Sequence, residues 1–284
     1  MRLKALILLA AFVLAVAAPA YSQSAPAPLL QIIREEVKVG RAAAHEKIEA
    51  GWPRAFAKAS WPYSYVALDS VTGPREAWFV ARWKSFADYE KSLAEESASA
   101  VLQAQLQALS AQDAEAINST RNIVALYRPG LSHNPRPGMA GVRYMRVYTF
   151  RVRPGREPEF AEIVKIYKEA LSKSDPDAHW GTYQVLTGMP GPTYIAFASM
   201  KSLAEMEPSP EREGRMMSAL GEENAKKLSR LQSDSTISVE VNLFAVSPKM
   251  SYVTTEFAAV EPDFWHPRPK AAAAKKEPAK TGTP

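Results

Sequence analysis

The order of structural signals along this 284-residue chain repeats at an interval of about 117 residues. Glycine-containing turns, helix starts and closing strands recur in the same order in both halves, which indicates a duplicated supersecondary unit. Such units bury their apolar faces against each other, so the repeat restricts the fold to arrangements that join two equivalent halves. The landmarks are Gly40 and Gly155, Gly73 and Gly191, Lys84 and Lys201, and Tyr127 and Phe244, which are 115, 118, 117 and 117 residues apart.

Each half has the order strand, helix, strand, strand, helix, strand. Runs of β-branched and aromatic residues indicate the strands, and apolar residues at helical spacing indicate the helices. This order is typical of the ferredoxin-like unit, whose helices cover one face of an antiparallel sheet. The predicted strands are 32–39, 63–68, 78–81 and 123–127, then 144–152, 182–186, 194–197 and 239–244; the predicted helices are 41–60 and one from 84, then 160–171 and one from 201.

We therefore predict an α+β fold: two tandem ferredoxin-like βαββαβ units packed sheet to sheet as an internal pseudo-dimer. One such sheet leaves a face uncovered, and two copies on one chain can bury those faces together. The units are expected at 29–128 and 142–248, with a Pro- and Gly-rich linker at 129–141. A C-terminal extension occupies 249–284, and its Ala-, Lys- and Pro-rich part is expected to be disordered from about 267.

Residues 1–22 have the pattern of a secretory signal peptide. Arg2 and Lys4 precede an apolar run at 5–18, and small residues allow cleavage after position 20 or 22. The run is shorter than the roughly 20 residues that a membrane-spanning helix needs. We expect an exported protein, periplasmic or secreted, with no membrane insertion after cleavage. The chain has no Cys, which excludes disulfides and thiol chemistry.

The net charge of +5 does not indicate nucleic-acid binding, because the surplus lies at the two ends. The first four residues carry +2 and the stretch from Pro267 carries +4, which leaves −1 for the remainder. A phosphate-binding surface needs Lys and Arg clustered on a folded face. We therefore expect no nucleic-acid partner.

A short motif in the second half resembles a known superfamily. Arg146-Val147-Tyr148-Thr149-Phe150 is followed by Arg153-Pro154-Gly155 and then Phe160. This run resembles the opening strand and Pro-Gly turn of the dimeric α/β-barrel superfamily, in particular its NIPSNAP-like branch, here as a tandem repeat. The resemblance implies that the two units form an intramolecular dimeric α/β-barrel with a cavity. It implies no single activity, since members include cofactor-free monooxygenases and haem-binding enzymes.

Two strands supply the candidate ligand-binding residues. Alternation places Arg146 and Tyr148 on one face of their strand, and Glu240 and Asn242 together on one face of the last strand. If the strands pair in matching register, Arg146 and Glu240 form an ion pair beside Tyr148 and Asn242. This set is either the polar end of a ligand pocket or an ordinary cross-strand ion pair.

Histidine is the usual general base and haem ligand, and the chain has four. His179 is the catalytic candidate because alternation groups it with Tyr183, a further candidate ligand-binding residue; a loop-capping role is the alternative. His45 falls on the apolar stripe of its helix and is expected to be a core histidine. No metal site is predicted, no cofactor is required, and haem at His179 is kept as an alternative.

Motifs for dinucleotide binding, P-loop hydrolysis, nucleophile-elbow hydrolysis and zincin proteolysis do not occur in the sequence.

The prediction is an exported protein that binds a small apolar or amphipathic ligand in the barrel cavity. The first alternative is an oxygenase-type enzyme, cofactor-independent or haem-dependent. The second is a structural module for self-association, and a homo-oligomer is compatible with each of these.

Overall fold

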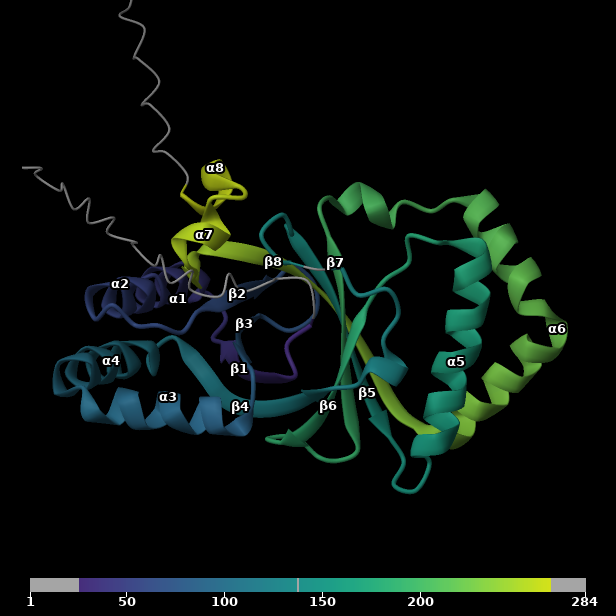
Figure 1. The fold of residues 1–284 in the computed structure, drawn as a ribbon, viewed down its shortest axis with the longest axis horizontal. Helices are drawn as coiled ribbons and strands as arrows, with labels where there is room; N and C mark the ends of the chain where they lie inside the picture. The colour runs from purple at the N-terminus through teal and green to yellow at the C-terminus, as the bar shows by residue number, and fades with distance from the viewer. Residues whose placement is uncertain (1–25, 137, 267–284) are drawn as a thin grey trace, which may run out of the picture.

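Eight antiparallel strands form one closed barrel in the computed structural model, which describes residues 26–136 and 138–266 (Figure 1). The strands follow one another around the barrel in the order β1-β3-β2-β8-β5-β7-β6-β4. Their bounds are β1 Leu29–Val37, β2 Tyr65–Ser70, β3 Glu76–Trp83, β4 Ile117–Tyr127, β5 Tyr144–Val152, β6 Gly181–Thr187, β7 Thr193–Met200 and β8 Thr236–Tyr252.

Helices lie outside the barrel at its two opposite sides (Figure 1). Helices α1 to α4 belong to the first half of the chain, α5 and α6 to the second, and α7 and α8 follow the last strand. The bounds are α1 Ala42–Glu49, α2 Gly51–Lys58, α3 Phe86–Ala98, α4 Ala100–Asp113, α5 Glu157–Ser174, α6 Pro210–Ser235, α7 Thr255–Ala258 and α8 Pro262–Trp265, with 3-10 turns η1 Pro129–Leu131 and η2 Leu203–Met206.

The α+β class and the barrel predicted from the sequence are confirmed. The strands of the two halves meet edge to edge, since β2 pairs with β8 and β4 pairs with β6. The sheet faces that were expected to pack together therefore become the inner wall of a single closed barrel. This arrangement buries the same apolar faces and also pairs the edge strands of both halves.

Apolar side chains from alternate strand positions fill the barrel. Trp78, Phe244, Ile123 and Ile195 are almost completely buried there. The Trp78 indole Nε1 donates a hydrogen bond to Glu76 Oε2 at 2.8 Å, and the Arg34 guanidinium pairs with Glu76 Oε1 at 2.6 Å. The barrel interior is thus mainly a packed core, and the buried Glu76 carboxylate within it is neutralised by a neighbouring cation.

Residues of the predicted C-terminal extension close one end of the barrel. Trp265 is buried and donates from Nε1 to the Ala140 carbonyl at 2.9 Å, while Phe257 and Phe264 contact its ring edge-on. The predicted signal peptide and the predicted disorder from 267 lie outside the described residues. Among the described residues, no helix has the length and apolar content to cross a membrane.

The helices contact the sheet differently in the two halves. In the first half, Phe56, Trp61 and Tyr65 belong to an aromatic cluster that fills the space between helices and strands, as expected of core aromatics. In the second half, α5 and α6 form an apolar core with each other and bow away from the sheet (Figure 1). Gly221, with φ of +73°, breaks the helical path of α6, a conformation that favours glycine. Near the start of α5, Phe160 packs on Val152 of β5 and Tyr194 of β7, and beyond this contact the helix pair stands off the outer face of β5, β7 and β8.

Candidate functional site

A cleft of about 940 Å³ separates the outer face of β5, β7 and β8 from the helices α5 and α6. Its walls are mainly apolar, and a further lobe of about 380 Å³ extends it toward the start of β8. This size suits a ligand of several rings. The side chains that form the walls include Phe150, Phe160, Ile163, Tyr167, Ala196, Ala198, Val239 and Val241, and the polar ones include Arg136, Arg146, Tyr148, Asp175, Asp177, His179, Glu205 and Arg212.

Strand β5 positions the polar group of the cleft floor. Its inward positions, such as Met145 and Val147, are buried in the barrel, so Arg146 and Tyr148 point outward into the cleft. The Arg146 guanidinium lies 5.1 Å from the centre of the Tyr148 ring, and that ring stacks on Phe150. Burial raises the pKa of the Tyr148 phenol, against the opposing effect of Arg146. At neutral pH the floor therefore presents one cation and one neutral hydroxyl donor.

The predicted pairing of Arg146 with Glu240 is wrong. In the observed register, Glu240 lies opposite Thr149 and Asn242 opposite Val147, whereas Leu243 lies opposite Arg146. Because facing residues of paired strands share a face, Glu240 and Asn242 are on the other side of the sheet from Arg146 and Tyr148. Glu240 is exposed there, and Asn242 lies against the turn at Gly73. Neither lines the cleft.

Tyr183 lies in a different cavity from Arg146 and Tyr148. Its side chain points into the barrel, where it contacts Tyr127 and Phe197 and lines a small cavity of about 120 Å³ at the barrel mouth. Burial raises the pKa of the Tyr183 phenol, so it stays protonated. The sequence-predicted ligand set is thus divided among the cleft, the barrel interior and an exposed strand face.

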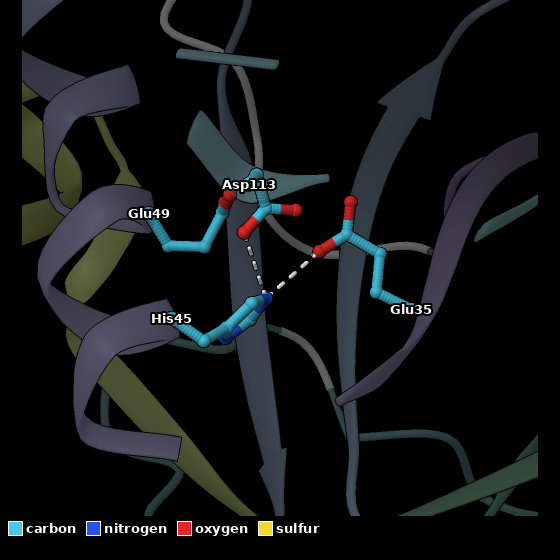
Figure 2. Close-up of side chains that lie close together, drawn as sticks. All are labelled: Glu35, His45, Glu49 and Asp113. Carbon is cyan, nitrogen blue, oxygen red and sulfur yellow. Dashed lines mark hydrogen bonds and ion pairs between the residues drawn. The ribbon is translucent and has the colours of Figure 1, made fainter. Parts of the chain in front are cut away.

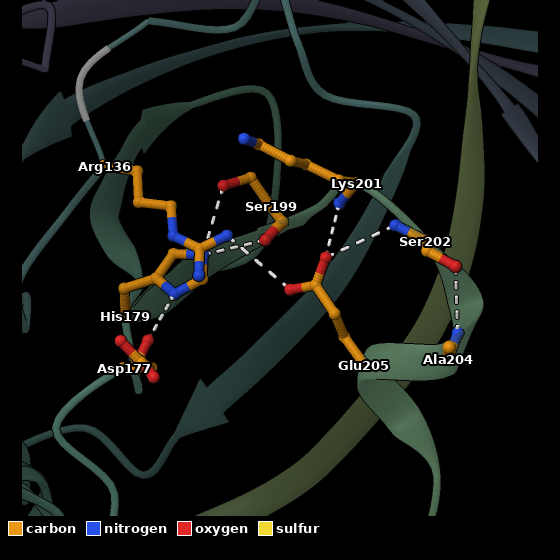
Figure 3. A network of polar contacts seen from close by, with 8 residues as sticks. All are labelled: Arg136, Asp177, His179, Ser199, Lys201, Ser202, Ala204 and Glu205. Atoms are coloured by element: carbon orange, nitrogen blue, oxygen red, sulfur yellow. Dashed lines mark hydrogen bonds and ion pairs between the residues drawn. The ribbon is translucent and has the colours of Figure 1, made fainter.

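His179 lines both the cleft and the small barrel cavity, and both of its ring nitrogens are occupied (Figure 3). Nδ1 lies 2.8 Å from the Asp177 carbonyl oxygen, and Nε2 lies 2.7 Å from the carbonyl oxygen of Ser199. A general base or a haem ligand needs a nitrogen lone pair directed at the substrate or the iron. His179 is the one histidine among the described residues lining the cleft. The cleft residues therefore do not fit a histidine-ligated haem.

Charged residues at one end of the cleft were missed in the sequence analysis. Glu205 accepts hydrogen bonds from the backbone N–H groups of Lys201 and Ser202, and its other oxygen lies 3.5 Å from the Arg136 guanidinium (Figure 3). Ser202 and Glu205 form a capping box, a pattern that is readable in the sequence as Ser-x-x-Glu. The capping box holds Glu205 in place, and Glu205 in turn positions Arg136.

Replacing Ser202 by alanine is expected to lower the free energy of unfolding by about 1 kcal/mol, because the cap of η2 is lost. Chemical denaturation of the two proteins measures this difference. Ser209→Ala, which removes the cap of α6, is the matched control, because it gives a similar loss without touching Glu205. A Ser202→Ala protein as stable as the wild type would contradict the assignment.

Comparisons with known proteins give no match to a family model and none to a curated protein. Solved structures do match. A candidate monooxygenase of Fusobacterium nucleatum subsp. nucleatum is 10% identical over 78% of this chain and 93% of its own, with a TM-score of 0.48. An anthrone oxidase-like protein is 14% identical over 80% and 93%, with a TM-score of 0.48. A chlorite dismutase variant of Candidatus Nitrospira defluvii is 9% identical over 80% and 93%, with a TM-score of 0.45.

The main prediction from the sequence, a protein that binds a small molecule of unknown identity, is corrected at this point. The matching structures are described as monooxygenases, an oxidase-like protein and chlorite dismutases, all named for enzymatic reactions. The substrate and the residues that act on it have to be argued from the cleft itself.

Proposed function

We propose that this protein is a cofactor-independent oxygenase whose substrate is an apolar molecule of several rings with an acidic hydroxyl group. The observation that carries the proposal is the cleft of about 940 Å³, whose apolar walls surround the Arg146 guanidinium and the Tyr148 hydroxyl. Apolar walls would bind the rings, and a small number of polar groups would orient them. This proposal rests on the geometry of the cleft.

Dioxygen accepts electrons one at a time from organic molecules, and an electron-rich anion gives up an electron more readily than the neutral molecule. The proposed oxidation therefore starts from the ionised substrate. A guanidinium beside the substrate hydroxyl favours its ionised form, so Arg146 would lower the free energy of the anion. The hydroxyl proton passes to water, and the resulting anion passes one electron to dioxygen. Superoxide and the substrate radical combine at a ring carbon that carries hydrogen, and the peroxide takes a proton back from water. Loss of water from that peroxide leaves a carbonyl group, so a CH₂ group and O₂ become C=O and H₂O.

The side chains of the cleft have separate parts in this scheme. Arg146 stabilises the negative charge of the substrate and then of the reduced oxygen. Tyr148, held against Phe150, donates a hydrogen bond from its neutral hydroxyl group. Phe160 and Val241, on opposite walls, enclose the rings and limit the access of water. No step in this scheme needs a haem, in agreement with the occupied nitrogens of His179.

The test is oxygen consumption by purified, EDTA-treated protein with a panel of one-ring, two-ring and three-ring phenols that includes a hydroxyanthrone. We expect consumption of one O₂ per substrate oxidised, formation of the carbonyl product and no requirement for added metal. Reactions under nitrogen and without protein are the controls. Oxidation of the whole panel at the spontaneous rate would overturn the proposal.

Replacing Ala198 by phenylalanine is expected to weaken the binding of the three-ring compound at least tenfold, because Ala198 lies on the cleft wall and is only partly buried. The larger ring occupies space that the substrate needs, and stability should change by only about 0.5 kcal/mol. Fluorescence titration measures the affinity. Ala198→Ser adds little volume and should bind as the wild type does; equal binding by the phenylalanine variant would place the ligand elsewhere.

The finer sequence predictions complete the proposal. We propose that the halves are tandem ferredoxin-like units of a NIPSNAP-like type, and that the protein is exported to the periplasm or secreted. The strand order around the barrel supports the tandem units. In one direction the first half reads β4-β1-β3-β2 and the second half reads β8-β5-β7-β6, so each half has its last, first, third and second strands in that order. Intact mass measurement on exported protein would reveal cleavage after residue 20 or 22.

A further inference from the structure

Four ionisable side chains meet on the opposite side of the barrel from the cleft. Glu35 comes from β1, His45 and Glu49 come from α1, and Asp113 is the last residue of α4. One nitrogen or oxygen atom from each lies within 4.8 Å of the others (Figure 2). His45 Nε2 is 3.0 Å from Glu35 Oε2 and 3.7 Å from Asp113 Oδ1.

Local structure explains how these groups converge. His45 and Glu49 are four residues apart, so they share the face of α1 that is turned toward the sheet. Glu35 lies on the adjoining strand, and α4 ends beside them at Asp113. Figure 2 shows the four side chains directed toward one another from these three elements. His45 is buried, as the sequence predicts for a core histidine, but it is surrounded by carboxyl groups.

The four side chains are nearly shielded from solvent, so a charge on any of them has a high desolvation free energy. The exposed fractions are 3% for the His45 side chain, 5% for Asp113 and 12% for Glu35, and Glu49 is buried. Three carboxyl groups lie around a single imidazole with little access to water, an arrangement that a bound cation would stabilise.

Asp113 supplies a second, independent observation. Its Oδ1 atom is buried and has no hydrogen-bond partner, and the 3.7 Å to His45 Nε2 is too long for a hydrogen bond. Buried polar atoms in folded proteins are nearly always satisfied, so an unsatisfied oxygen that faces the cluster indicates that a further group belongs there.

We propose that Glu35, His45, Glu49 and Asp113 bind one divalent first-row transition-metal ion. One imidazole nitrogen and three carboxylate oxygens form a donor set that suits ions such as Mn²⁺ and Zn²⁺. The ligand atoms around a tetrahedral zinc ion lie about 3.4 Å apart. The four atoms of the cluster lie within 4.8 Å of one another, so side-chain rotations of about an ångström would complete the set.

A metal ion in this position would join β1, α1 and α4 and fix the helices of the first half to the barrel. The site is separate from the cleft, which lies between β5, β7, β8 and the helices α5 and α6. The sequence analysis predicted no metal site because it considered histidines and cysteines alone. The spacing of His45 and Glu49 was readable, but the positions of Glu35 and Asp113 beside them were not.

The test uses the full chain, stripped of metal with EDTA and titrated separately with Mn²⁺, Zn²⁺ and Mg²⁺. We expect one Mn²⁺ or Zn²⁺ per chain by electron paramagnetic resonance or elemental analysis, and much weaker binding of Mg²⁺. Pulsed measurements on the Mn²⁺ complex should detect a coupled histidine nitrogen. Binding should also raise the melting temperature, because only the folded chain assembles the four ligands.

The variants Glu49→Gln and Asp113→Asn should each weaken binding at least tenfold and abolish the rise in melting temperature. Glu46→Gln, on the same helix but with a side chain that is 45% exposed and paired with Lys249, is the matched control and should bind as the wild type does. Wild-type protein that takes up less than one ion per chain would overturn the proposal, as would unchanged affinity in both cluster variants. These readouts do not involve substrate oxidation, so they are independent of the proposed oxygenase function.

Discussion

Replacing Arg146 by glutamine is expected to lower kcat/KM for the oxidation of a phenolic ring compound by about two to three orders of magnitude, the usual effect of losing one charge-stabilising group. Glutamine retains hydrogen-bond donors and a similar length but removes the charge that stabilises the substrate anion. Substrate binding should weaken far less, because the apolar walls of the cleft are unchanged. Steady-state oxygen consumption at several substrate concentrations separates kcat from KM.

Arg151→Gln is the control for this experiment. Arg151 lies on the same strand, is exposed and does not line the cleft, so its replacement removes the same charge without touching the proposed site. The two variants should be equally stable to within about 0.5 kcal/mol. If Arg146→Gln oxidised the substrate at the wild-type rate, Arg146 would have no role in the reaction, and the proposed anionic intermediate would be contradicted as well.

Replacing Trp78 by alanine is expected to lower the free energy of unfolding by about 3–5 kcal/mol, the usual range for a large buried aromatic residue. Trp78 is 1% exposed, contacts Phe244 within the barrel and lies under the Arg34 guanidinium. The substitution also removes the hydrogen bond to Glu76 Oε2, which leaves part of a buried carboxylate unsatisfied. Urea denaturation followed by circular dichroism measures the loss.

Trp78→Phe separates the two contributions. Phenylalanine keeps most of the apolar volume and loses the indole N–H, so we expect a smaller decrease of about 1–3 kcal/mol, the cost of an unsatisfied buried acceptor. Trp61→Ala is a second control, because Trp61 is only partly buried and lies outside the barrel. If Trp78→Ala unfolded at the same urea concentration as the wild type, the barrel interior would contribute little to the free energy of unfolding.

Local patterns in the sequence predicted local structure well. Alternation along β5 predicted that Arg146 and Tyr148 share one face, because successive side chains of a strand point to opposite sides. The expectation that this face lines a cavity inside the barrel is wrong, since Met145 and Val147 fill the barrel and Arg146 and Tyr148 line the cleft outside it. The pairing of β5 with β8 was not predictable in this way. Register depends on contacts between strands and on a pairing irregularity between Arg151 and Val152, and a shift by one position moves Glu240 to the other face.

The cleft and the acidic cluster depend on distances that the sequence does not encode locally. Apolar periodicity predicted helices in the second half, but their separation from the sheet depends on the bend at Gly221 and on the contacts between α5 and α6. Glu35 and Asp113 are far apart in the chain and meet only because β1 and the end of α4 lie beside α1. Both features are therefore products of tertiary packing.

The joining of all eight strands in one chain has a further consequence. A barrel assembled from two identical subunits carries every substitution twice, so both sides must serve the same purpose. Here a covalent linker keeps the partner half at high effective concentration whatever the dilution, so assembly does not depend on protein concentration. Each half can then specialise: one side holds a dense aromatic core and a buried acidic cluster, and the other side keeps an open cleft. Linkage within one chain thus allows an asymmetry that two copies of one chain would not permit.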